Sequence, residues 1–181
     1  KSNDSIVGYG WSLDIPSIKR VNKRGTDKLY SSRDFTSSLS GELVDRVDIN
    51  NYFEAKVDNG DFLRYTYVND DSWIAVDKMG TKYTFGKSTS ARKDDPNDSS
   101  HVYEWMLEEV RDTNDNFIRY EYFKNNGQIY PSKIFYTGHG VNDGIFQVVF
   151  NREAFDMSPK MYYSMFEVKS NFRIKNVEVL Q

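Results

Sequence analysis

The sequence predicts an all-β protein in which antiparallel hairpins follow one another as a meander. Alternating polar and apolar residues, the pattern of half-buried strands, recur along the chain, for example at 62–68 and 117–122. Turn-forming residues (Gly, Asn and Asp) separate these runs. Aromatic residues make up 15% of the chain, including 13 Tyr and 12 Phe, which favours pleated sheets over a thick aliphatic core.

The predicted strands are rich in aromatic and β-branched residues, and the spacing between turns favours long hairpins. The segment from Val102 to Val110 could form a short helix, but Trp105, Met106 and Leu107 stand side by side there. Because a helical stripe needs apolar residues three and four apart, we predict that this segment is also a strand. The clearest other strand patterns lie at residues 62–68, 82–85, 117–122, 145–150 and 172–175.

Two tryptophan-bearing segments resemble each other. Trp73 and Trp105 each lie on a predicted strand, and each strand leads into a turn that begins with an aspartate, Asp77 or Asp112. In both cases the return strand carries aromatic residues two apart. This similarity suggests a repeated hairpin unit, and we expect Trp73 and Trp105 to anchor successive hairpins.

Glycines mark the expected turns. The Asn59-Gly60 pair is the strongest signal for a two-residue hairpin, because such a turn needs positive φ at both positions. Gly80 and Gly127 are also predicted to make turns.

Residues 87–100 interrupt the hairpin pattern. Between Lys87 and Ser100 only Ala91 and Pro96 are apolar. We therefore predict one long polar loop here, exposed to solvent and flexible.

Composition excludes several classes of function. Against 24 Lys and Arg stand 27 Asp and Glu, a net charge of −3, so the chain lacks the basic surface that grips nucleic acid or an anionic membrane. The absence of cysteine excludes disulfides, thiolate metal sites and a cysteine nucleophile. No apolar run reaches the ~20 residues of a membrane-spanning helix. We expect neither direct membrane insertion nor a nucleic-acid partner.

No residue set in the sequence predicts catalysis, a cofactor or a metal. The chain has two histidines and no Gly-x-Ser-x-Gly motif. Glu108 and Glu109 are adjacent, so on a regular strand they face opposite sides and cannot act on one glycosidic bond. Ser88-Thr89-Ser90 resembles an element of ADP-ribosyltransferase toxins, but the chain contains no Glu-x-Glu or Gln-x-Glu pair.

The segment Gly8-Tyr9-Gly10-Trp11-Ser12-Leu13, followed by Ile18-Lys19-Arg20, carries a family resemblance. It resembles the opening of the SpvB-type N-terminal region, which plasmid virulence proteins share with the B subunits of insecticidal toxin complexes. Leu39-Ser40-Gly41-Glu42-Leu43, the Trp73 hairpin and residues 172–177 are similar to later elements of that region. The resemblance implies that residues 1–181 form a single SpvB-like β segment of a larger protein, with Gly8, Gly10 and Trp11 setting the first close contact between sheets.

The resemblance implies a structural role. In toxin complexes of this kind, the B subunit and an RHS/YD-repeat subunit form a hollow shell of β-hairpins around a cytotoxic C-terminal segment, and a propeller docks the shell on a pore-forming subunit. We therefore expect a secreted, extracellular, non-catalytic segment of the shell. Its expected partners are the remainder of the parent chain, the RHS-repeat shell subunit and a pore-forming toxin subunit. In SpvB-type virulence proteins the ADP-ribosyltransferase lies C-terminal to this region.

Two alternatives remain open at this point. One is a carbohydrate-binding β-sandwich in which exposed aromatic side chains such as Tyr65, Tyr67 and Trp73 stack on a glycan. The other is a fragment of a glycoside hydrolase that uses Glu and Asp, for which the sequence places no carboxylate pair.

Overall fold

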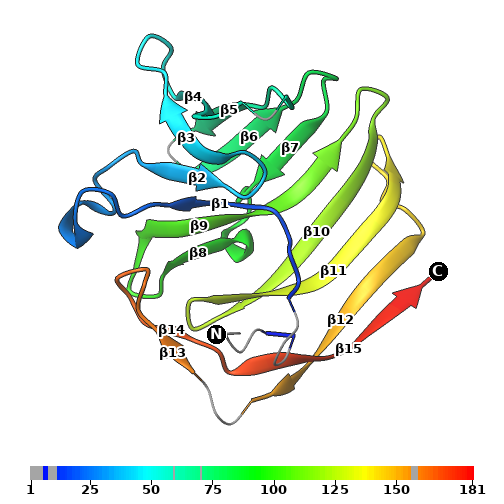
Figure 1. Ribbon diagram of the computed structural model, residues 1–181. Helices are drawn as coiled ribbons and strands as arrows, with labels where there is room; N and C mark the ends of the chain where they lie inside the picture. The colour runs from blue at the N-terminus through cyan, green and yellow to red at the C-terminus, as the bar shows by residue number, and fades with distance from the viewer. Residues whose placement is uncertain (1–5, 8–11, 59, 70, 156–158) are drawn as a thin grey trace.

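A computed structural model describes residues 6–7, 12–58, 60–69, 71–155 and 159–181 (Figure 1). The described residues form short and long antiparallel strands and two single-turn 3-10 helices, η1 (Thr26–Lys28) and η2 (Thr89–Ala91). The prediction of an all-β antiparallel protein is therefore confirmed. The strands are β1 (Ser17–Arg20), β2 (Phe35–Ser37), β3 (Gly41–Asp45), β4 (Tyr52–Ala55), β5 (Arg64–Val68), β6 (Ser72–Val76), β7 (Lys82–Phe85), β8 (Arg92–Asp95), β9 (Asp98–Arg111), β10 (Asn116–Asn125), β11 (Gln128–His139), β12 (Phe146–Ala154), β13 (Lys160–Met161), β14 (Val168–Lys169) and β15 (Phe172–Leu180).

The first part of the chain closes into a ring of strands. β1 to β7 pair consecutively, β7 pairs with the second half of β9, and β1 pairs with the middle of β9. The long strand β9 therefore joins both ends of the meander. The ring holds the main core, whose largest fully buried side chains are aromatic.

The second part leaves the ring as an open, curved sheet. β10 pairs with the end of β9, and β11, β12 and β15 follow in order, so β15 forms the outer edge (Figure 1). β13 and β14 form a separate two-stranded hairpin. The protein thus combines a closed ring with an open wall, and β9 belongs to both.

Both predicted tryptophan hairpins are present. Trp73 lies on β6, which turns at residues 77–81 into β7, and Trp105 lies on β9, which turns at residues 112–115 into β10. The segment from Val102 to Val110 is part of β9, as predicted.

Residues 87–100 do not form the predicted long loop. They contain η2, β8 and the first residues of β9. Two of the charged side chains that suggested solvent, Lys93 and Asp94, are buried, and each pairs with an opposite charge on another strand, whereas Lys87 and Asp98 are exposed. A polar strand whose charges are paired has the same composition as a loop, and this explains the error.

The turn at Asn59-Gly60 also differs from expectation. β4 ends at Ala55 and β5 begins at Arg64, so the connection is longer than a two-residue hairpin; Asn59 lies outside the described residues. The two-residue turn occurs instead at Asn126-Gly127, between β10 and β11. There φ is +46° and +73°, the positive pair that this turn requires.

Candidate functional site

The aromatic cluster inside the ring is the first candidate site. Trp73 and Trp105 are fully buried, and their ring centroids lie 6.1 Å apart in an edge-to-face arrangement. Tyr67 stacks on Trp73 at 4.5 Å, and Phe35 packs edge-on against both tryptophans. Because these residues lie at alternate positions of neighbouring strands, the pleat directs all of them into the ring.

This burial contradicts the carbohydrate-binding alternative for the three aromatic residues that it named. Tyr65 and Trp73 have no exposed surface, and Tyr67 is 4% exposed. A ring that stacks on a sugar must present a face to solvent, so none of these three can bind a glycan. Their period-two spacing indicated a strand correctly, but it could not tell the core face from the outer face.

A buried arginine supports the same cluster. The Arg20 guanidinium lies 5.0 Å from the Phe35 ring centroid and 5.5 Å from that of Trp105. It donates hydrogen bonds to the main-chain carbonyls of Val102 and Ser32. Sequence reasoning missed Arg20, because an arginine on a short strand usually indicates the solvent face.

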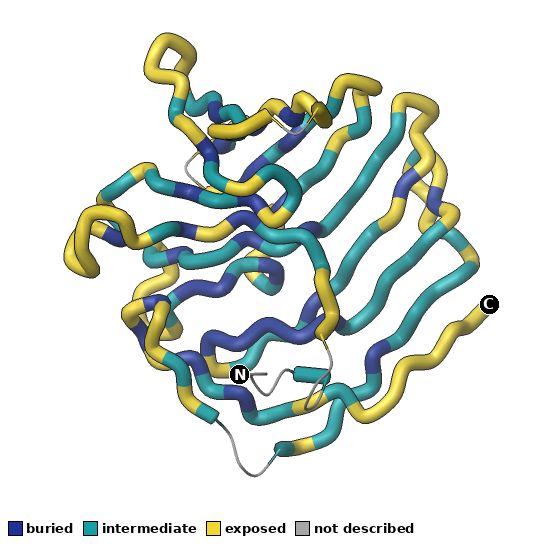
Figure 2. The backbone as a smooth tube through the Cα atoms, viewed as in Figure 1, coloured by how far each residue is buried: buried dark blue, intermediate teal, exposed yellow. Residues whose placement is uncertain are grey.

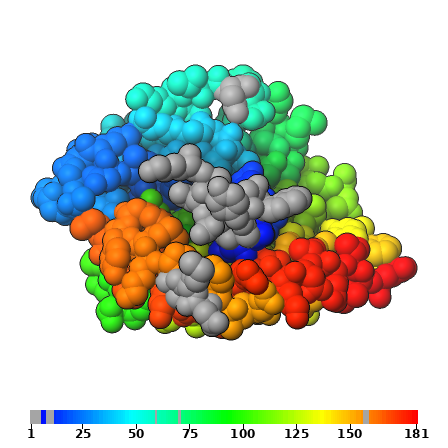
Figure 3. All heavy atoms as spheres, turned by 60° about the horizontal axis from the view of Figure 1, so that its bottom comes forward, coloured from blue at the N-terminus to red at the C-terminus, as the bar shows by residue number. Residues whose placement is uncertain are grey.

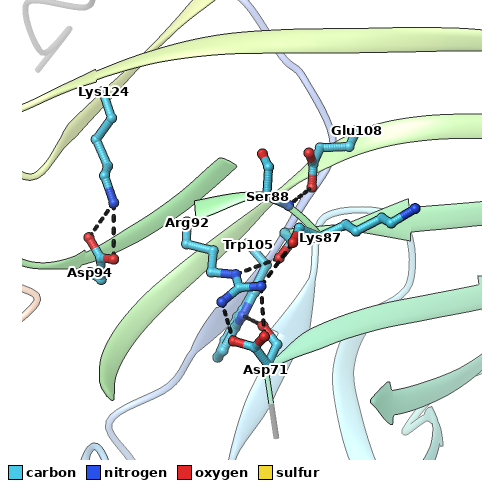
Figure 4. Close-up of polar contacts among 9 residues, drawn as sticks. Asp71, Lys87, Ser88, Arg92, Asp94, Trp105, Glu108 and Lys124 are labelled. Atoms are coloured by element: carbon cyan, nitrogen blue, oxygen red, sulfur yellow. Dashed lines mark hydrogen bonds and ion pairs between the residues drawn. The ribbon is translucent and has the colours of Figure 1, made fainter. Parts of the chain in front are cut away.

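A second arginine ties η2 and β8 to the ring, as Figure 4 shows. Both terminal nitrogens of Arg92 pair with the carboxylate of Asp71, and its Nε donates to the carbonyl of Gly86 at 2.6 Å. The Trp105 indole N–H donates to the main-chain oxygen of Asp71 at 2.9 Å. One turn residue, Asp71, therefore connects Arg92 to the buried tryptophan.

A polar cleft of about 760 Å³ lies beside β9 and β10, and both Glu108 and Glu109 line it. The expectation that adjacent glutamates face opposite sides is wrong here. Thr84 of β7 pairs with Glu109, but the next residue, Phe85, pairs with Leu107, so a β-bulge falls at Glu108. A bulge puts two residues of one strand against one of its neighbour and so turns both side chains toward the same side.

The cleft gives the glycosidase hypothesis no support. A glycosidase needs one carboxyl group with a raised pKa, to act as an acid. Hydrogen bonds from Arg111 instead lower the pKa of Glu109. Glu108 accepts a hydrogen bond from the main-chain N–H of Ser88 at 2.8 Å, and Glu121 pairs with Arg119 at 3.1 Å.

A cavity of about 880 Å³ between the ring and the open wall is lined by apolar and polar side chains, among them Ser17 and an ion pair, Lys93 and Glu104. Lys93 Nζ lies 3.0 Å from Oε2 of Glu104, and the Ser17 hydroxyl donates a hydrogen bond to the other carboxylate oxygen, Oε1, at 2.8 Å. Burial by itself raises the pKa of Glu104, but the positive charge of Lys93 and these hydrogen bonds outweigh it, so the pKa is lowered.

We expect the variant Glu104→Gln to be less stable than the wild type by about 2 kcal/mol at pH 7, because it leaves the Lys93 charge buried without a counter-charge. Because the pKa of Glu104 in the folded state lies below its ordinary value, the ionised pair stabilises the fold above that ordinary value, and this effect is lost as pH falls through the lowered pKa. The difference between the two proteins in urea unfolding should therefore vanish in acid. A difference that is constant from neutral to acid pH would contradict the assigned pair.

The predicted anchor residues fall into three groups. Gly8, Gly10 and Trp11 lie outside the described residues. Gly60, Gly80 and Gly127 lie in turns and have positive φ values, and Trp73 and Trp105 lie in the core. Their role as anchors stays a prediction, which mutation must test.

Metal-binding clusters and membrane-spanning helices are both absent from the described residues. No three His, Asp or Glu side chains in that part of the chain gather where they could hold a metal ion. No helix in the same part is long and apolar enough to cross a membrane.

Residues 60–143 match a family model described as Salmonella virulence plasmid 65kDa B protein. The mono(ADP-ribosyl)transferases SpvB of Salmonella choleraesuis and Salmonella typhimurium are each 36% identical to this chain over 146 residues, which covers 66% of the chain. The chain spans 25% of the length of these relatives.

Solved structures share the fold at low sequence identity. The N-terminal domain of effector protein SpvB from Salmonella typhimurium strain LT2 superposes with a TM-score of 0.80 at 18% identity, covering 97% of this chain and 78% of that domain. A TcdB2-TccC3-Cdc42 crystal structure gives 0.78 at 17% identity, covering 98% of this chain and 12% of the other. The structure of a Photorhabdus luminescens Tc holotoxin pore gives a TM-score of 0.74 at 17% identity, covering 97% of this chain and 11% of the other. The family match, the sequence identity and the shared fold together show that this chain is similar to an SpvB-type N-terminal region.

Proposed function

We propose that this chain is a non-catalytic structural segment of a bacterial toxin, and that it forms part of a β-sheet shell that encloses and delivers a cytotoxic cargo. The similarity to segments of much longer toxin chains supports this proposal. So does the arrangement of charged groups, since the carboxylates of the polar cleft are bound by arginines and main-chain N–H groups rather than poised for proton transfer.

The open edge at β15 is the observation that carries the proposal. β15 is the last strand of the sheet, and it is exposed along most of its length (Figure 2). At the start of β15 the Ile174 N–H donates to the carbonyl of Ile6, and the Phe172 N–H donates to the hydroxyl of Tyr130. Figure 3 shows β15 at the margin of that face of the molecule. A long exposed edge with apolar side chains is a surface for a further strand.

The exposed side chains of β15 fit the same role. Val177 and Val179 point to one face of the strand and are 52% and 69% exposed. Continuation of the sheet would cover them. We infer that the wall continues past β15 in the secreted parent protein and that residues 1–181 form one segment of this wall. The partners of the segment would be the rest of the parent chain, an RHS-repeat shell subunit and a pore-forming subunit.

The variant Val179→Lys tests this proposal. In the 181-residue chain Val179 is exposed, so we expect the free energy of unfolding to change by no more than about 0.5 kcal/mol and the melting temperature to change little. In the full-length toxin the lysine would be buried against the next part of the wall, and the enclosed segment should become sensitive to added protease. Val47→Lys is the matched control, since Val47 is 95% exposed on the hairpin between β3 and β4. Equal protection of the cargo in Val179→Lys and the wild type would contradict the proposal.

A further inference from the structure

Four turns lie side by side at one end of the sheet, and we call them the hairpin rim. They are residues 56–58 and 60–63 after β4, 77–81 after β6, 112–115 after β9 and 140–145 after β11. The last three run along the upper right of the molecule in Figure 1.

Direct contacts join each of these turns to the next. Lys78 Nζ donates to the carbonyl of Gly60 at 3.0 Å, which links the first two turns. A Cβ atom on Gly80 would lie 2.7 Å from Thr113, so the second and third turns touch. The Gly140 N–H donates to the carbonyl of Asp115 at 3.0 Å, which links the third and fourth. The rim is therefore one continuous surface.

Three of the four turns are held in shape by an aspartate whose side chain accepts main-chain hydrogen bonds. Asp58 accepts a hydrogen bond from the main-chain N–H of Gly60. The Asp77 side chain accepts two hydrogen bonds, from the main-chain N–H groups of residues 79 and 81. The Asp112 side chain likewise accepts two from the main-chain N–H groups of residues 114 and 116. Turns that are already ordered lose little conformational entropy when they bind, which favours affinity.

Large apolar side chains protrude from the rim into solvent. Exposed fractions run from 57% at Phe62 to 96% at Val141. A single exposed apolar residue is ordinary, but five on one continuous surface of such a polar chain are not. The five are Val57, Phe62, Met79, Val141 and Ile145.

Phe62 is also held in a conformation that costs free energy. Its φ is +52°, in the left-handed region that bulky residues seldom adopt. The cost is about 1–2 kcal/mol. Because more than half of the side chain stays exposed, core packing does not repay this strain. Lys78 lies over the ring, with Nζ 5.6 Å from its centroid, and helps to hold it outward.

The rim is acidic. Its described residues carry six aspartates and two lysines, whereas the net charge of the whole chain is only −3. Arg111 and Arg119, on the strands that lead into the rim, pair with Asp115 and Asp143. Even with these two arginines counted, the rim remains negative, and the complementary surface would be basic.

We propose that the hairpin rim is the docking surface for a separate protein subunit, one whose surface sets Lys and Arg side chains around apolar hollows. The charge argues for a separate subunit over another part of the same chain, because electrostatic attraction speeds the encounter of free molecules and adds little for a tethered segment. The apolar side chains would supply affinity and the aspartates orientation. This role is additional to the wall formed through β15 and does not depend on it.

Site-specific photo-cross-linking in the full-length protein, expressed with its toxin subunits, tests this. A benzophenone side chain is placed at Met79, at Val141 or, as the matched control, at Val47. We expect Met79 and Val141 to form adducts with one separate polypeptide, mapped by mass spectrometry to a peptide of net positive charge. The yield should fall as NaCl rises from about 0.05 M to about 0.5 M, because the Debye length shrinks over that range. The Val47 position should give no such adduct.

A second measurement separates docking from folding. With the benzophenone at Ile145, the double variant Met79→Ser/Val141→Ser should reduce the adduct about tenfold, as expected when exposed hot-spot side chains are truncated. Protease protection of the cargo should not change in this variant, so failure of docking and failure of the wall are distinguishable. The proposal would be overturned if no adduct formed, or if adducts formed only within the same polypeptide or with lipid. It would also be overturned by adducts that map to an acidic peptide, that are no stronger than at Val47 or that are insensitive to salt.

Discussion

The variant Trp105→Ala is expected to lower the free energy of unfolding by about 3–5 kcal/mol, the range typical of truncating a large buried aromatic residue. Trp105 is fully buried and packs edge-on against Phe35 and Trp73. Its indole N–H donates to Asp71, and the Arg20 guanidinium lies over its ring. Truncation would create a cavity and also remove the partners of two polar groups.

Urea unfolding measures this effect, and Tyr162→Ala is a matched control because Tyr162 is 58% exposed. The control should change stability by no more than about 0.5 kcal/mol. The intermediate variant Trp105→Phe keeps most of the packing and should fall between the two. An unchanged unfolding midpoint in Trp105→Ala would refute the role of Trp105 as an anchor.

The second large effect is expected for Gly86→Ala, which should lower the free energy of unfolding by about 3–5 kcal/mol. Left-handed strain and overpacking both contribute to this loss. Gly86 has φ of +60°, and a Cβ atom added there would lie 2.9 Å from the Cβ of Trp105. The Gly86 N–H donates to the carbonyl of Met106, and its carbonyl accepts from Arg92. The main chain therefore cannot move away from the tryptophan without breaking these bonds.

Gly41→Ala separates the two causes. Gly41 also has positive φ, +73°, but a Cβ atom there would meet nothing within 4 Å. In this variant only the left-handed strain should lower the free energy of unfolding, by about 1–2 kcal/mol. Equal losses for Gly86→Ala and Gly41→Ala would show that contact with Trp105 contributes nothing.

The sequence predicts the strands and hairpins well, because a residue's side of a pleated strand follows directly from its position. The Trp73 and Trp105 hairpins are examples. The closure of the ring could not be predicted in this way. It depends on β1 pairing with the middle of β9, between residues almost ninety positions apart, such as Ser17 and Met106. No local pattern specifies a pairing at that distance.

The candidate sites were predicted less well, for physical reasons that differ between residues. Lys93 and Asp94 have the composition of a loop, and only their partners Glu104 and Lys124, on other strands, allow them to be buried. The alternation rule places Glu108 and Glu109 on opposite faces, and a single bulge breaks that rule. Arg20 and Arg92 act through main-chain carbonyls, which carry no sequence signal.

The central claim is that the wall continues across the free edge of β15. Amide hydrogen exchange tests it most directly, by comparing residues 175–180 in the 181-residue chain with the same residues in the full-length protein. We predict that the amides pointing away from β12 exchange fast in the 181-residue chain and become protected in the full-length protein, as they would when a further strand pairs with them. Fast exchange of these amides in both proteins would contradict the account.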